Sequence, residues 1–341
     1  MSDSSPILIT GLSGFIARQT ALQLLRQGRA VRGTVRRAAG GLPALLARHG
    51  ADVSRLEIVS ADLAADAGWD AAVAGCRHVL HMASPYPLQQ PRERMALVPE
   101  ARDGTLRILR AARRAGVARV VLTSSLVAVQ SGHPVQPGRL WTEADWSMDD
   151  SPTITPYQLS KTLAERAAWD EVQQGGPELA VINPGFVLGP TLDGNGGTSA
   201  EVIALMLSGK YPAVPHLGLS TVDVRDVAAA HIAALTVPGA AGRRFIATEA
   251  TLTLMQMAQC LAPAFPAYRS RLPKFTLPNA AVRLLAMFDR NVRTAVPELG
   301  KVETASNAAA TEVLGIRFRP AAEAVVESAR TLIEYGKVAR R

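Results

Sequence analysis

The sequence contains only two cysteines among 341 residues, Cys76 and Cys260, and neither lies in a recognisable motif. Such a chain cannot build a disulfide framework, and this is typical of a protein kept in a reducing compartment. Aromatic residues make up only 5% of the chain, and no apolar run reaches the length of a membrane-spanning helix. The N-terminus also lacks the apolar segment of a signal peptide. We therefore expect a cytoplasmic protein with no membrane partner.

Acidic residues are outnumbered by basic ones, and the net charge of +8 brings a nucleic-acid partner into consideration. The densest group of arginines, however, falls within residues 102–119, with Leu106 and Leu109 between them. This spacing indicates the solvated face of an amphipathic helix, so we expect no nucleic-acid partner. His78 and His81 lie three apart on an expected strand and therefore point to opposite faces, so we expect no metal site.

Strands and helices alternate through the first half of the chain. Apolar runs predict strands at residues 7–9, 30–35, 56–59, 79–82, 117–122 and 179–182, and a long helix at 99–115. This alternation predicts an α/β fold with a Rossmann-type, doubly wound parallel sheet.

The composition changes towards the C-terminus, and this change predicts a domain division. Past Thr251 prolines multiply and strands fade, so we expect a smaller, mostly helical C-terminal lobe. We assign residues 1–190 to a dinucleotide-binding domain, to which 220–248 return. Residues 191–219 and 249–341 form a substrate-binding lobe. We further expect Asp226 to cap the helix that begins at Val227.

The turn after the first strand carries small residues three positions apart. Gly11 lets the chain turn directly off the strand, Gly14 lets the backbone approach a pyrophosphate, and Ala17 lets the next helix pack closely on the sheet. The free N–H groups of that helix would bind the phosphates. The candidate phosphate-binding residues are Gly11, Ser13, Gly14, Phe15 and Ile16.

The end of the second strand indicates which dinucleotide binds. A site for NAD usually places a carboxylate there, but this chain has Arg36 and Arg37 instead. Two guanidinium groups suit the 2′-phosphate of NADP(H), although a solvated basic turn is the alternative. Asp62, with Leu63 beside it, follows the third strand and is placed either for the adenine edge or for capping a helix. Ala83 and Ser84 follow the fourth strand and are candidates for contacting the middle of the cofactor.

The candidate catalytic residues follow the fifth strand. Thr123 and Ser125 come just after this strand. Tyr157 and Lys161 come later at helical spacing, on one face of a helix that Pro156 can begin. A nearby ammonium group lowers the pKa of a tyrosine, so that its phenol can exchange a proton at neutral pH. Ser125 can then hydrogen-bond the same carbonyl oxygen. The spacing predicts Ser125, Tyr157 and Lys161 as the catalytic residues.

These motifs resemble those of the extended short-chain dehydrogenases/reductases, in the branch of dihydroflavonol 4-reductase, cinnamoyl-CoA reductase and microbial aldehyde/ketone reductases. The matching segments read ITGLSGFIA, RVVLTSS, YQLSKTLAERAAWD, INPGFVLGP and VDVRDVAAAH. The resemblance implies that Arg36 binds the 2′-phosphate, that Ser125 belongs to the catalytic triad, and that Pro184 and Val187 border the nicotinamide carboxamide. It also implies bulky aromatic or aliphatic carbonyl substrates; the candidate pocket residues are Ser84, Tyr86, Gln130 and Leu188.

We therefore expect an NADPH-dependent reductase that transfers hydride reversibly to an aldehyde or ketone. Two alternatives remain: an NAD-dependent nucleotide-sugar epimerase or dehydratase using the same triad, and a non-catalytic regulator that senses NADP(H). The partner is a small-molecule carbonyl compound. The chain is expected to be a monomer or a homodimer that pairs through the helices beginning near Pro99 and Tyr157.

Overall fold

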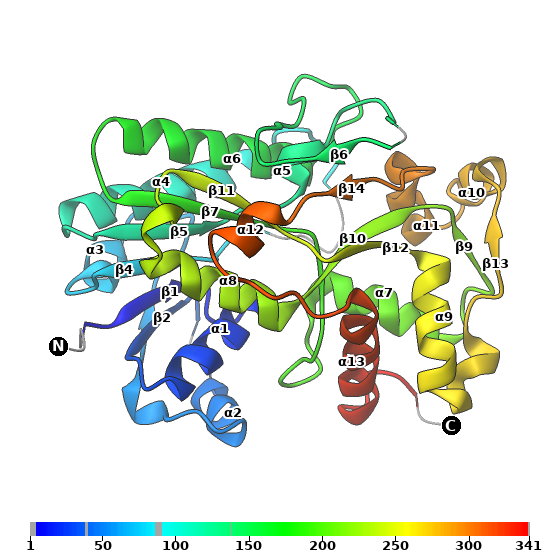
Figure 1. The fold of residues 1–341 in the computed structure, drawn as a ribbon, viewed down its shortest axis with the longest axis horizontal. Helices are drawn as coiled ribbons and strands as arrows, with labels where there is room; N and C mark the ends of the chain where they lie inside the picture. Colours follow the sequence, from blue (N-terminus) through cyan, green and yellow to red (C-terminus); the bar gives the residue numbers. More distant parts are fainter. Residues whose placement is uncertain (1–4, 38–39, 86–90, 137, 340–341) are drawn as a thin grey trace.

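A seven-stranded parallel sheet forms the centre of the molecule (Figure 1). The computed structural model describes residues 5–37, 40–85, 91–136 and 138–339. The strand order is β11-β7-β5-β4-β1-β2-β3. Its strands are β1 (Ile7–Thr10), β2 (Val31–Val35), β3 (Leu56–Ser60), β4 (His78–His81), β5 (Arg119–Thr123), β7 (Glu178–Pro184) and β11 (Arg243–Ala247). The order reverses direction after β1, so the predicted doubly wound sheet is confirmed.

Helices cover both faces of this sheet, as the ribbon shows (Figure 1). One face carries α1 (Phe15–Arg26), α2 (Leu42–Arg48), α8 (Val224–Thr236) and the short α12 (Ala308–Glu312). The other carries α3 (Trp69–Val73), α4 (Val98–Arg114) and α6 (Pro156–Gln173). Each layer of helices encloses its own apolar core against the sheet, which is why the strands read as nearly continuous apolar runs.

Two elements at the centre of the fold carry the predicted catalytic residues. All five residues of β5 are buried, in agreement with a strand in the middle of a parallel sheet. Helix α6 begins with a capping box, in which Thr155 accepts from the Gln158 backbone N–H and the Gln158 side chain accepts from the Thr155 N–H. Pro156 occupies the first helical position. The start of α6 is therefore fixed one residue before Tyr157.

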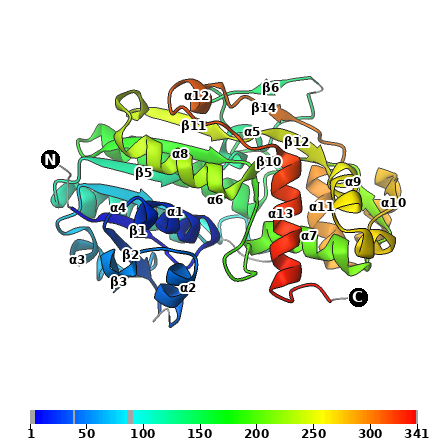
Figure 2. The same ribbon diagram turned by 60° about the horizontal axis from the view of Figure 1, so that its bottom comes forward.

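A smaller lobe continues from the carboxyl end of the sheet (Figures 1 and 2). It contains the sheet β12-β10-β8, made by β8 (Phe186–Leu188), β10 (Gly218–Asp223) and β12 (Ala250–Thr253). Around it pack α7 (Gly197–Ser208), α9 (Leu254–Ala264) and α13 (Ala321–Glu334). The short helices α10 (Asn279–Leu285) and α11 (Arg290–Ala295) complete this lobe, whereas α5 (Val127–Gln130) follows β5 and packs against α6 and β7.

Strands persist in this region beyond the point where they were expected to fade. Besides β12, the pairs β9 (Ala213–Pro215) with β13 (Phe275–Leu277), and β6 (Leu140–Trp141) with β14 (Thr304–Ala305), are parallel. Each pair joins segments far apart in the sequence, so neither could be recognised from a local pattern. Within the described ranges, no helix has both the length and the apolar character needed to cross a membrane.

The cap of helix α8 differs from the prediction. Asp223, not Asp226, is the N-cap residue, and its side chain accepts from the backbone N–H of Arg225. Asp226 is instead buried inside the first turn and accepts from the backbone N–H of Arg319. Strand β10 ends at Asp223, which places this residue at the N-cap, whereas Asp226 lies three residues further on, inside the helix.

Candidate active site

A cavity of about 480 Å³ opens at the carboxyl ends of β1, β4, β5 and β7. Its wall comes from both the central sheet and the smaller lobe. Of the residues predicted for catalysis or binding, those that line it are Gly11, Gly14, Phe15, Ile16, Ser84, Thr123, Ser125, Gln130, Tyr157, Lys161, Pro184 and Val187. The structure thus brings together most of the candidate residues, which come from segments up to about half the chain apart.

The turn after β1 requires a glycine, and the helix that follows it begins with uncapped N–H groups. Gly11 has a φ of +69°, and a β-carbon added there would lie 2.9 Å from Cα of Ala83. Helix α1 starts after Gly14 with no side chain capping its first N–H groups. Uncapped N–H groups at a helix N-terminus attract an anionic group. The cradle therefore fits the pyrophosphate of a dinucleotide.

Ser125, Tyr157 and Lys161 lie along one wall of this cavity. Ser125 follows β5 and is 9% exposed. Tyr157 is half-buried in the first turn of α6, and Lys161 is one turn further on the same helix, only 7% exposed. The Lys161 ammonium group donates a hydrogen bond of 3.2 Å to the backbone carbonyl of Thr123. This bond ties α6 to the end of β5, two residues before Ser125.

Burial controls the charge of Lys161. Because desolvation disfavours the ammonium form, the pKa of Lys161 falls to about 8, while the nearby carboxylate of Glu165 opposes the fall. Burial also lowers the pKa of His81 to about 3, with a further lowering by Lys161, and that of His231 to about 4. At neutral pH both histidines are thus uncharged and Lys161 is mostly protonated.

Two buried histidines, His81 and His231, hold the ends of β1, β4 and β5 in place. His81 Nδ1 accepts from Thr10 Oγ1 at 2.8 Å, and Thr10 Oγ1 in turn accepts from the backbone N–H groups of Met82 and Ala83. His231 contacts Thr123 Oγ1 at 2.7 Å through Nε2. The ends of β1, β4 and β5 are therefore fixed by side chains that stay neutral.

The remaining predicted cofactor residues lie around this cavity. Arg36 and Arg37 follow β2 and are both exposed. The preceding Thr34 accepts through Oγ1 from the Gly11 N–H at 3.1 Å, so the two arginines stand close to the glycine turn.

Asp62 and Leu63 follow β3. Asp62 accepts from the Ala64 N–H in a local turn rather than capping a helix, and Leu63 is buried. Ala83 and Ser13 are partly or fully exposed at the rim of the turn.

The proposed pocket residues are divided. Gln130 and Ser84 line the cavity, whereas Leu188 is fully buried in the core of the lobe and Tyr86 lies outside the described residues. The structure adds residues that sequence reasoning missed: Gln158, Glu298, Lys301 and Glu303. Gln158 Nε2 donates to Glu298 Oε1 at 2.9 Å, and Lys301 pairs with Glu298 at 3.2 Å. No local signal marks the last three, because they lie more than a hundred residues beyond Tyr157.

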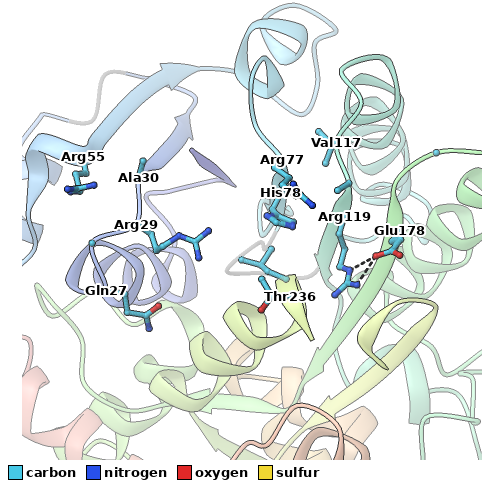
Figure 3. Close-up of a pocket in the computed structure, with 14 residues that line it drawn as sticks. Gln27, Arg29, Ala30, Arg55, Arg77, His78, Val117, Arg119, Glu178 and Thr236 are labelled. Carbon is cyan, nitrogen blue, oxygen red and sulfur yellow. Dashed lines mark hydrogen bonds and ion pairs between the residues drawn. The ribbon is translucent and has the colours of Figure 1, made fainter. Parts of the chain in front are cut away.

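A larger hollow of about 890 Å³ lies at the opposite, amino ends of the strands (Figure 3). Arg29, Arg55, Arg77 and Arg119 line it, and Arg119 pairs with Glu178 at 2.7 Å. None of the predicted site residues lines this hollow. Both cysteines are free, and within the described part of the chain no cluster of three or more His, Cys, Asp and Glu side chains is placed to hold a metal ion.

Known proteins resemble this chain in sequence and in fold. Residues 7–246 match the model of the NAD-dependent epimerase/dehydratase family. The chain is 36% identical to cinnamoyl-CoA reductase 1 of Oryza sativa subsp. japonica over 77% of this chain and 76% of that protein. It is 31% identical to dihydroflavonol 4-reductase of Zea mays over 78% and 76% of the two chains. The crystal structure of Gre2 from Candida albicans in complex with NADPH superposes with a TM-score of 0.80 at 26% identity, covering 97% of this chain and 99% of that one.

Proposed function

Because the chain belongs to the NAD-dependent epimerase/dehydratase family, the extended short-chain dehydrogenases/reductases, we propose that it is an NADPH-dependent reductase of aldehyde and ketone carbonyl groups. The observation that carries this proposal is the meeting of Ser125, Tyr157 and Lys161 with the glycine turn around one cavity. The similarity to plant reductases and to an NADPH-bound reductase fold supports it.

The chain's own residues supply the proton of the reaction. NADPH, when bound, supplies the hydride. Tyr157 donates its phenolic proton to the carbonyl oxygen, and the ammonium group of Lys161 stabilises the phenolate that remains. Ser125 donates a hydrogen bond to the same oxygen and orients it. Below a pH of about 8 Lys161 is largely in the charged form that this role requires.

The cofactor would lie along the strand ends from the glycine turn to Lys161. We propose that Gly11, Ser13, Gly14, Phe15 and Ile16 bind the pyrophosphate and that Arg36 and Arg37 bind the 2′-phosphate. Asp62 and Leu63 would contact the adenine end, and Ala83, Ser84 and Thr123 the middle. Pro184 and Val187 would border the nicotinamide. Two exposed guanidinium groups beside the glycine turn support this choice of cofactor over NADH.

We propose that the two parts of the chain bind different ligands, with the bounds predicted from the sequence. Residues 1–190 and 220–248 would bind the dinucleotide, and residues 191–219 and 249–341 would cover the substrate. Lining of the cavity by Glu298, Lys301 and Glu303 supports a contribution of the second part to the pocket. An aromatic or otherwise bulky carbonyl compound is the substrate class we propose.

The proposal is tested by following the oxidation of NADPH and NADH side by side against aromatic aldehydes, keto esters, aryl ketones and dihydroflavonols. We expect turnover with NADPH that falls sharply with NADH. Arg36→Ser should raise the KM for NADPH by about 10-fold or more and leave the KM for NADH nearly unchanged, because only NADPH carries the 2′-phosphate. NADPH binding without turnover on any of these compounds would contradict a reductase and favour a sensor, and tightly retained NAD⁺ in the purified protein would favour an epimerase or dehydratase.

A further inference from the structure

A carboxylate with no predicted role lies at the centre of the molecule. Glu165 is on α6, one turn beyond Lys161 and two turns beyond Tyr157, and its side chain is completely buried. Arg244, on β11, is its ion-pair partner, with Nε 2.6 Å from Glu165 Oε1 and a side chain only 7% exposed. A charged pair removed this far from water is costly unless its hydrogen bonds are complete.

The second oxygen of Glu165 is bonded to the segment that carries Ser125. Glu165 Oε2 accepts from Ser124 Oγ at 2.5 Å and from Asn183 Nδ2 at 2.8 Å. Asn183 Nδ2 also donates to the backbone carbonyl of Ser125 at 3.2 Å. One carboxylate therefore contacts the residue before Ser125 directly and the backbone of Ser125 through a single amide.

Arg244 anchors this arrangement to the rest of the fold. Its Nη1 donates to the carbonyls of Glu143 and Asp145, at 3.0 and 2.6 Å. Its guanidinium group also lies over the ring of Trp146, 3.8 Å from the ring centre. With these contacts the guanidinium cannot follow Glu165 if α6 shifts, so the ion pair fixes the position of the helix against β5, β7 and β11.

We propose that the Glu165–Arg244 pair is the positioning unit of the reaction, holding the Ser125 segment and the Tyr157–Lys161 face of α6 in their reacting arrangement. This inference rests on the proposed reductase function. Neither residue lines the cavity, so neither is a catalytic residue. A misplacement of about 1 Å in such a site can cost about 10²-fold in rate.

Electrostatics give the same pair a second effect on the site. The titratable groups that interact with Lys161 are Glu165 on its own helix and His81 on β4, while His231 on α8 contacts the side chain of Thr123, whose carbonyl accepts from Lys161. Among them Glu165 is the anion that raises the pKa of Lys161 against the lowering by burial. Removing its charge would make Lys161 lose its proton at a lower pH.

The first test is Glu165→Gln, measured as the holoenzyme with NADPH on the best substrate of the panel. The glutamine amide oxygen can still accept from Ser124 or Asn183, but the ion pair is lost. We expect kcat to fall about 10²-fold, with KM and the NADPH dissociation constant within about threefold of wild type. The alkaline fall of kcat/KM should begin at a lower pH than in the wild type.

A double variant separates positioning from simple stabilisation. Glu165→Gln with Arg244→Met removes both buried charges and leaves an apolar side chain of similar length, so the melting temperature should recover relative to Glu165→Gln alone. The proposal expects kcat to stay low and the shifted pH profile to persist. Recovery of kcat and of the pH profile together with the melting temperature would show that the pair only stabilises the fold and would overturn the proposal.

Glu178→Gln is the matched control, because Glu178 on β7 pairs with the buried Arg119 on β5 at the amino ends of these strands, away from the proposed active site. It should leave kcat and the pH profile unchanged. An equal loss of kcat in both variants would also overturn the proposal. If the wild-type enzyme turns over no carbonyl compound while it still binds NADPH, the proposed function itself fails, and the positioning role falls with it.

Discussion

The ion pairs at the two ends of the central sheet differ in how far they are exposed to water. At the carboxyl end the Glu165–Arg244 pair is closed off from water on both sides, with side chains 0% and 7% exposed. At the amino end Arg119 is equally buried, but its partner Glu178 is 55% exposed (Figure 3). The buried pair is fully held by neighbouring groups, whereas the other can exchange its partner with water. The buried, fully hydrogen-bonded ion pair thus lies at the end of the sheet where we propose that the reaction takes place.

Cavity size alone would favour the amino end of the sheet as the active site. The amino-end hollow measures about 890 Å³ and the cavity beside Tyr157 about 480 Å³. The arginines of the larger hollow have a simpler explanation, because α1 and α8 both end there and cations favour helix C-termini. Convergent catalytic groups, and not volume, distinguish the smaller cavity as the active site that we propose.

Removing one hydroxyl group at each end of the sheet should show the largest difference in activity between the two ends. Tyr157→Phe deletes the proposed proton donor, so we expect kcat for carbonyl reduction to fall about 10³-fold while NADPH binding is retained. Thr236→Val deletes a hydroxyl group in the wall of the amino-end hollow and should leave kcat unchanged. Steady-state kinetics and fluorescence titration with NADPH measure both. A Tyr157→Phe enzyme with most of its activity would refute the assignment.

The residues of the proposed active site could be recognised in the sequence because their signals are local. The glycine turn, the apolar run of β5 and the capping box before Tyr157 are each contained in a few consecutive residues. The partner of Glu165 was not predictable, since Arg244 is 79 residues away and becomes its neighbour only through the order of β5, β7 and β11. The cap of α8 was predicted wrongly for a different reason: β10 runs directly into the helix, which begins at Val224 and not at Val227.

Acid should weaken the carboxyl end through its buried histidines. His81 and His231 have folded pKa values of about 3 and 4, below the ordinary value of 6.5, because burial disfavours the charged ring. Between these values and 6.5 the unfolded chain binds more protons than the folded one. Stability is therefore fully present above pH 6.5 and falls on acidification by about 1.4 kcal/mol per pH unit for each histidine.

Urea unfolding at pH 6.5 and pH 5 measures this loss. His231→Gln should remove one titrating group, so the variant should lose about 2 kcal/mol less than wild type between these two pH values. The comparison of slopes matters here, and not the absolute stability, because the substitution also changes the contact with Thr123. Identical slopes in the two proteins would mean that His231 is not held neutral.

Gly11 and Gly28, at opposite ends of the sheet, have nearly equal φ angles, so their substitutions can be compared directly. Gly11 and Gly28 have φ values of +69° and +73°, but an added β-carbon at Gly11 meets Ala83 at 2.9 Å, whereas none of the described atoms lies within 4 Å at Gly28. Gly28→Ala should cost about 1 kcal/mol of stability for the left-handed conformation alone. Gly11→Ala should cost more and also raise the NADPH dissociation constant about 10-fold, since its methyl group displaces the β4 loop. If both substitutions changed the NADPH dissociation constant equally, the glycine turn would not be the site that binds the cofactor.

The smallest effect is expected at the exposed ion pair of the amino end. Glu178→Gln removes a carboxylate that is 55% exposed, and water screens such a charge, so the free energy of unfolding should fall by less than about 1 kcal/mol. Arg119 keeps the carbonyls of Ala234 and Val237, at 2.9 and 2.8 Å, as acceptors and is not left unpaired. The loss should shrink further in high salt. Glu165→Gln, measured in the same urea titration, should lower the free energy of unfolding several times more, because Arg244 would remain a buried charge without an anion. A loss of equal size for Glu178→Gln would mean that the ion pairs at the two ends of the sheet contribute equally to stability.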